Sequence, residues 1–233
     1  CIGRCGNGRP KENSYILVHS CTELTYFTTA RDHVNGQVKL QLLKSYRFQA
    51  GIRCMNSTDI YNQYSPMSML IGYDDCMYKW LPDQGFKKHS DLSSVILENN
   101  RDDITNCYLE LSNHPQISYF ALNTAIYTVD NRLYTSQPVQ LFKLMKPIGS
   151  LLQHKTSSNY LFASIVGQLN VLDVRFPRHT FAQRPIPYTH DRMKFHSVGS
   201  KAIDVIMGYA RDSQHITLHS LCIKSFENEN EVD

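Results

Sequence analysis

The chain has 233 residues, of which 42% are hydrophobic and 19% are charged, and its net charge is +3. A chain of this length can bury about 70–75% of its unfolded surface, so it is expected to form an ordinary globular core. The small net charge does not by itself indicate nucleic-acid binding. Because no apolar run reaches the roughly 18 residues that a transmembrane helix needs, we expect no membrane partner.

Five segments, taken in chain order, share one pattern. Each has an apolar run, a polar or glycine-containing turn, and a second apolar run, which predicts a β-hairpin. The segments are Ser14–Thr29, Met67–Pro82, Ile117–Arg132, Tyr160–Arg175 and Asp204–Leu221. Between the second and the third, "DLSSVILENN" (residues 91–100) predicts a short helix that stands alone.

The hairpins recur at a regular interval. The residues near the ends of their second strands are Phe27, Trp80, Val129, Leu172 and His219, which lie 43 to 53 residues apart. Repeats of about 40–45 residues with loop insertions are typical of WD-repeat propeller blades, whereas a helical repeat would show helix periodicity in every unit. We therefore predict an all-β fold, a WD-repeat β-propeller with seven blades whose repeats have diverged and some of whose segments lie outside this chain.

The same reasoning predicts the domain organisation. Residues 1–13 contain glycine and cysteine and are expected to form a connector or an edge segment. Residues 14–226 are expected to form the β-propeller, and residues 227–233 an acidic tail.

The fourth hairpin carries a more specific motif, "LFASIVGQLNVLDVR" (residues 161–175). It resembles the box found in WD-repeat substrate receptors of cullin-4 ubiquitin ligases: an apolar pair, a small pair, an apolar inner strand, and a closing Asp-x-Arg. Two positions depart from the box, since Val166 stands in place of an acid and Leu172 in place of an aromatic residue. The resemblance continues over residues 148–221, where Thr189-His190 falls at the Gly-His pair of the next repeat.

This resemblance implies a function. The protein would be a non-enzymatic substrate receptor of a cullin-4-type E3 ubiquitin ligase complex, linked to chromatin and located in the nucleus, also in the cytoplasm. The strand end would deliver Arg175, with Asp173, Val174 and Phe176, to a pocket on a damage-binding-protein-type propeller adaptor. Another face would present a protein substrate. Arginine suits such a pocket because its planar fork offers several directed donors and stays charged.

Two alternatives stay open. An arginine after a strand is often simply solvated, and an aspartate at a strand end often caps the turn. In addition, "LDVRFP" (residues 172–177) and "YTHDR" (residues 188–192) fit the divergent propeller of a polymerase I core-factor subunit. The protein would then be a propeller scaffold in a transcription or chromatin assembly with no ligase role.

A second group of residues suggests a wider contact surface. Basic residues alternate with aromatic ones after the fourth hairpin, which is one footprint of nucleic-acid or partner contact. An ordinary solvated loop between blades is the alternative. The basic residues are Arg175, Arg178, Arg184, Arg192 and Lys194.

The remaining reactive side chains indicate neither catalysis nor a cofactor. Asp74-Asp75 and Asp130-Asn131 match turn chemistry, and His190 is expected to bond a turn aspartate. The seven cysteines are an odd number and lie mostly in apolar stretches, which favours free buried thiols over a disulfide framework. Cys1 and Cys5 form only one loose pair near His19 and Cys21, so no metal site is predicted.

Overall fold

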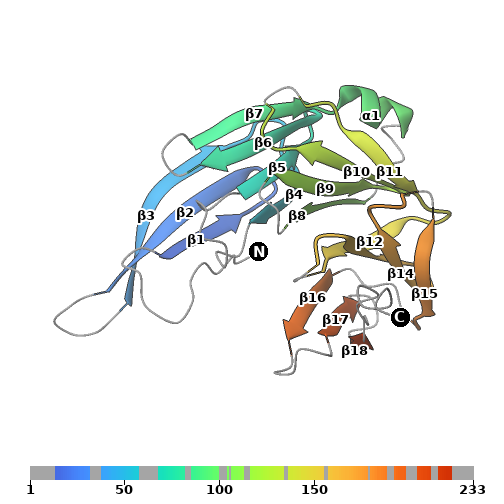
Figure 1. Cartoon of the computed structure of the whole chain (residues 1–233). Coiled ribbons are helices and arrows are strands. Elements are labelled where there is room, and N and C mark those ends of the chain that lie inside the picture. The colour runs from blue at the N-terminus through green and yellow to red at the C-terminus, as the bar shows by residue number, and fades with distance from the viewer. Residues whose placement is uncertain are drawn as a thin grey trace, which may run out of the picture. The chain divides into compact units, whose positions relative to one another are not determined.

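The computed structural model describes most of the chain (Figure 1). The described residues are 14–31, 38–57, 68–81, 85–99, 104, 106–112, 116–133, 136–154, 157–177, 179–187, 192–197, 204–210 and 215–221. The chain divides into two compact units, residues 1–143 and residues 144–233. Both units consist of antiparallel sheets, which confirms the predicted fold class.

The first unit contains three sheets, each made of strands that follow one another in the chain. The first sheet is β1 (Ser14–His19), β2 (Glu23–Arg31) and β3 (Val38–Arg47). The second is β4 (Ile52–Ser57), β5 (Ser68–Gly72), β6 (Cys76–Leu81) and β7 (Gly85–Asp91). The third is β8 (Cys107–Leu111), β9 (Ile117–Leu122), β10 (Ala125–Asp130) and β11 (Val139–Lys143).

The second unit contains two sheets with the same simple order. One is β12 (Ile148–Gln153), β13 (Tyr160–Ile165), β14 (Gln168–Asp173) and β15 (Thr180–Pro185). The other is β16 (Arg192–Ser197), β17 (Asp204–Ala210) and β18 (His215–Leu221). All five predicted hairpins are present, as β1–β2, β5–β6, β9–β10, β13–β14 and β17–β18.

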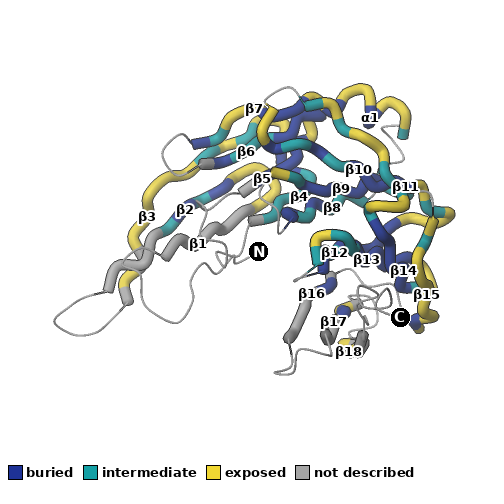
Figure 2. Tube along the Cα trace, viewed as in Figure 1, coloured by how far each residue is buried: buried dark blue, intermediate teal, exposed yellow. Residues whose placement is uncertain are grey.

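Burial within a sheet falls from the middle strands to the last one. β9, β13 and β14 are buried along nearly their whole length, whereas most residues of β11 and every residue of β15 are exposed or only partly buried (Figure 2). A strand buried on both faces reads as a continuous apolar run rather than an alternating one. This is why the middle hairpins are the segments that the sequence reveals.

Neighbouring sheets within a unit pack face to face. In the first unit, Met69 and Ile71 of β5 share a core with Phe120 and Leu122 of β9. Tyr26 of β2 stacks on Trp80 of β6, with ring centroids 4.0 Å apart. In the second unit, Phe162 of β13 and Met193 of β16 belong to one cluster. The first strands of successive sheets also meet, β4 with β8 and β12 with β16, as the inner strands of propeller blades do.

The predicted short helix is α1 (Ser93–Glu98). The Asp91 carboxylate accepts the amide of Ser93 at 2.9 Å and so satisfies a donor at the start of the helix. Val95 and Ile96 are buried in the core shared by the second and third sheets. The helix is therefore an insertion between blades that extends their common core.

The expectation that the cysteines are buried needs correction. Among the cysteines that the structure describes, only Cys76 is buried, while Cys54 and Cys107 are half-buried and Cys21 is exposed. Cys21 lies in the β1–β2 turn, which is polar and open to solvent. Cys1, Cys5 and Cys222 lie outside the described residues, as do residues 1–13 and 227–233. The seven-blade count and the domain boundaries stay predictions.

None of the helices in the described part of the chain is long and apolar enough to cross a membrane.

Candidate partner-binding site

The site lies where strand β14 ends. β14 is hydrogen-bonded between β13 and β15, so its position is fixed on both sides. Directly after Asp173 the chain turns: the Val174 amide donates to the Asn159 carbonyl at 2.8 Å, and the Phe176 amide donates to the Asp173 carbonyl at 3.0 Å. These bonds determine the direction in which the next side chains leave the sheet.

Asp173 and Arg175 form a tightly bonded pair inside this turn. The Asp173 Oδ1 atom accepts the Arg175 amide at 2.9 Å and its Nε at 3.0 Å. The Nη2 atom of Arg175 donates to Oδ2 at 2.7 Å. Only 3% of the Asp173 side chain is exposed, against 49% of the Arg175 side chain. The buried carboxylate therefore anchors a guanidinium whose outer half faces solvent.

The charges in this pair stabilise each other. The hydrogen bond from the Arg175 side chain lowers the pKa of Asp173, against the opposing effect of burial. The same bond raises the pKa of Arg175. An arginine held in one orientation loses less side-chain entropy when a partner binds it, which makes it a good anchor for an acceptor on another protein.

Two aromatic rings lie beside the guanidinium. Its central carbon lies 5.9 Å from the ring centroids of both Tyr160 and Phe176. Phe181 of β15 lies 5.6 Å from Tyr160, and Phe176 and Phe181 are 62% and 50% exposed. The result is a cation framed by accessible apolar rings, a composition that is common at the centre of protein interfaces.

The structure gathers some of the predicted site residues and separates others. Asp173, Val174, Arg175 and Phe176 lie together in the turn after β14. Arg184 is exposed on β15 and pairs with Leu169 near the start of β14, so it lies toward the opposite end of the sheet. Arg178 lies outside the described residues, as do the side chains of Arg192 and Lys194 on β16. The described basic residues thus do not form one continuous patch.

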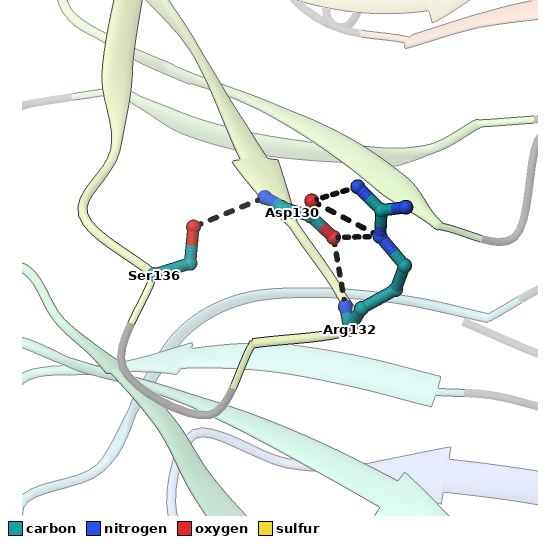
Figure 3. Close-up of polar contacts among 3 residues, drawn as sticks. All are labelled: Asp130, Arg132 and Ser136. Atoms are coloured by element: carbon teal, nitrogen blue, oxygen red, sulfur yellow. Dashed lines mark hydrogen bonds and ion pairs between the residues drawn. The ribbon is translucent and has the colours of Figure 1, made fainter.

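The same arrangement recurs in the first unit, after strand β10. The Asp130 Oδ1 atom accepts both the amide and the Nε of Arg132 at 2.9 Å, and Nη2 donates to Oδ2 at 2.5 Å (Figure 3). The Ser136 hydroxyl accepts the Asp130 amide at 3.2 Å and braces the turn. Hydrogen bonds from Arg132 lower the pKa of Asp130 to about 2. The turn was predicted, but the role of Arg132 was not, although "VDNR" and "LDVR" end the third strands of successive blades.

The Asp74-Asp75 pair has a structural role, as its turn position predicted. Asp74 accepts the Tyr78 hydroxyl, and Asp75 pairs with Arg53 of β4, whose Nη2 lies 3.5 Å from Oδ1. The side chains of Arg53 and Asp75 are both more than nine-tenths buried. Among the described residues, no three His, Cys, Asp or Glu side chains are grouped so that they could hold a metal ion.

Comparisons with known proteins agree with this architecture. No protein-family model and no curated protein matches the chain. Among solved structures, the chain is similar to the WD40 domain of SCAP from fission yeast, with 10% sequence identity and a TM-score of 0.51. The match covers 97% of this chain and 66% of that domain's chain. This likeness and the succession of antiparallel sheets show that the chain has the fold of a WD-repeat β-propeller.

Proposed function

We propose that this protein is a non-enzymatic WD-repeat substrate receptor that docks on the propeller adaptor of a cullin-4-type ubiquitin ligase through Arg175. Asp173, Val174 and Phe176 form the rest of the docking turn. The observation that carries the proposal is the half-exposed Arg175 guanidinium, fixed by the buried Asp173 carboxylate at a strand end. The resemblance of residues 161–175 to the receptor box supplies the identity of the partner.

The geometry supports docking by this residue for a physical reason. Nε and Nη2 of Arg175 are engaged with Asp173, so the fork is rigid before any partner arrives. The exposed rings of Phe176 and Phe181 add apolar area around it. Charged anchors of this kind carry much of the binding energy when a partner excludes water from them.

The test is the affinity of the purified adaptor for Arg175→Ala. We expect binding to weaken by roughly 30- to 700-fold, because such anchors contribute on the order of 2–4 kcal/mol and about 1.4 kcal/mol corresponds to a tenfold change. The variant also removes the guanidinium that pairs with the buried Asp173 carboxylate, so its melting temperature should fall by a few degrees. Binding is therefore measured well below that temperature.

Lys146→Ala is the matched control. Lys146 is exposed in the bend that precedes β12, and its ammonium donates to the Val166 carbonyl in the β13–β14 turn, at the other end of β14. The substitution removes one positive charge from the same unit without changing the docking turn, so the affinity of Lys146→Ala for the adaptor should equal that of the parent protein. If Arg175→Ala binds the adaptor as tightly as Lys146→Ala does, the docking role is wrong.

A further inference from the structure

We propose that Cys54 and Cys107 form an oxidisable dithiol, which closes to a disulfide and ties two neighbouring blades of the first unit together. The Sγ atoms of these residues lie 3.0 Å apart although 53 residues separate them in the chain. Cys54 is on β4 and Cys107 is on β8, the first strands of the second and third sheets.

The two strands are held against each other independently of the sulfurs. Two residues after Cys54, the side-chain amide of Asn56 donates to the Leu109 carbonyl at 2.9 Å and to the Glu110 carboxylate at 3.0 Å. Both cysteines also pack against the core that the two sheets share. The thiols are therefore kept in contact by the packing of the blades, so little chain movement is needed to join them.

The reaction is a thiol–disulfide exchange with a small disulfide such as oxidised glutathione. One cysteine attacks that disulfide and releases one glutathione thiol, leaving a mixed disulfide on the protein. The second cysteine then attacks the protein sulfur and releases the second glutathione. Two protein thiols and one disulfide thus become one protein disulfide and two glutathione thiols, and both sides balance.

The environment sets the speed of this reaction. Burial, and then the contact with Cys107, raise the pKa of the Cys54 thiol. Because the thiolate is the reactive form, the Cys54 thiol reacts slowly at neutral pH. Cys54 and Cys107 are only half-buried, which leaves a route for the oxidant.

The experiment equilibrates the full chain in glutathione buffers that range from fully reduced to fully oxidised. After acid quenching, free thiols are alkylated and the protein is digested for peptide mapping. We expect a peptide that joins Cys54 to Cys107, formed with the loss of two hydrogens. Exposed Cys21 should instead gain glutathione, so Cys21→Ser should still form the Cys54–Cys107 link. Alkylation of both Cys54 and Cys107 in the fully oxidised buffer would overturn the proposal.

A second measurement shows whether the link joins the blades. Closing a loop of this length constrains the unfolded chain, so oxidation should raise the melting temperature of the Cys21→Ser protein by about 5–10 °C. Cys54→Ser in the same background should melt at one temperature in both buffers. Peptide mapping of the parent protein does not require any variant to fold, so it tests the Cys54–Cys107 link independently of the melting measurement. An oxidised protein that melts no later than the reduced one would contradict the tie between the sheets.

Discussion

At the scale of single residues, the pairs Asp173–Arg175 and Asp130–Arg132 form the same hydrogen bonds, but their aspartates are buried to different extents. Each carboxylate accepts the amide and the guanidinium of the residue two positions later. The Asp173 side chain is 3% exposed and that of Asp130 is 26% exposed. Since removing a partner from a buried polar group costs more than removing it from a hydrated one, the two pairs should differ in their effect on stability.

Replacing each aspartate by alanine tests this difference. Asp173→Ala should lower the free energy of unfolding by about 1–3 kcal/mol, because the Arg175 amide and guanidinium lose their acceptor. It should also weaken adaptor binding, because Arg175 is no longer oriented. Asp130→Ala should cost less stability. Urea denaturation of both variants gives the comparison, and an equal or larger loss for Asp130→Ala would contradict it.

The Asp130–Arg132 pair also leads to a prediction about how stability depends on pH. The pKa of Asp130 is lowered from an ordinary value of 3.8 to about 2. A carboxylate with a lowered pKa in the folded state stabilises the protein above its unfolded pKa, and this contribution disappears as the pH falls from about 4 toward about 2. Carboxyl NMR titration should place the Asp130 midpoint near the lower value. In Arg132→Gln the midpoint should rise toward 3.8, and an unchanged midpoint would rule out the guanidinium as the cause.

At the scale of turns and strands, two glycines with positive φ differ in their surroundings. Gly167, in the β13–β14 turn, has φ +79° and open space where a Cβ would lie. Gly51, just before β4, has φ +83°, and its Cβ would meet the Cys21 carbonyl at 3.2 Å and the Tyr73 ring at 3.3 Å. The Gly51 carbonyl also accepts the Tyr73 amide at 3.1 Å, so it ties the turn before β4 to the β5–β6 turn of the same sheet.

Alanine at each glycine separates backbone strain from crowding. Gly167→Ala should destabilise the protein by about 1–2 kcal/mol, the cost of a left-handed conformation for a residue with a Cβ. Gly51→Ala should cost more, because the same strain is joined by contacts that must give way. Chemical denaturation of the two variants measures the difference. If they lose the same stability, packing around Gly51 contributes nothing.

The sequence reveals the middle strands of each blade better than the others, for a physical reason. β13 and β14 are buried at every position except the first, and most of these buried residues are apolar. β15 is mostly exposed, and β4 is polar enough to contain Arg53 and Asn56, so neither shows a strong pattern. The side-chain pairing of Asp130 with Arg132 depends on the conformation of the turn that follows β10, which the amino-acid sequence alone does not define. The contact of Cys54 with Cys107 requires the packing of two separate sheets.

At the scale of the whole molecule, the fold and the proposed function depend on different parts of the chain. The fold comes from a repeated unit of successive antiparallel strands, and the chain is similar in fold to a solved WD40 domain at 10% sequence identity. The candidate docking residues lie in turns at strand ends, where the packing places few constraints on the sequence. The identity of the partner must therefore be tested on the intact protein.

Co-purification from cells, with mass spectrometry of the bound proteins, separates the two proposed assemblies. A receptor should retain the damage-binding-protein-type adaptor and cullin-4 subunits, whereas a transcription scaffold should retain polymerase or TATA-box-binding subunits. Arg175→Ala should lose the adaptor and cullin-4 but keep proteins bound to other faces, because the change removes one anchor in a single turn. Arg184→Ala, toward the other end of the sheet, should keep the adaptor.

If Arg175→Ala and the parent protein retain the same cullin-4 subunits, the ligase is joined through another surface. If only polymerase or TATA-box-binding subunits are retained by the parent, the receptor function is wrong and the scaffold function takes its place.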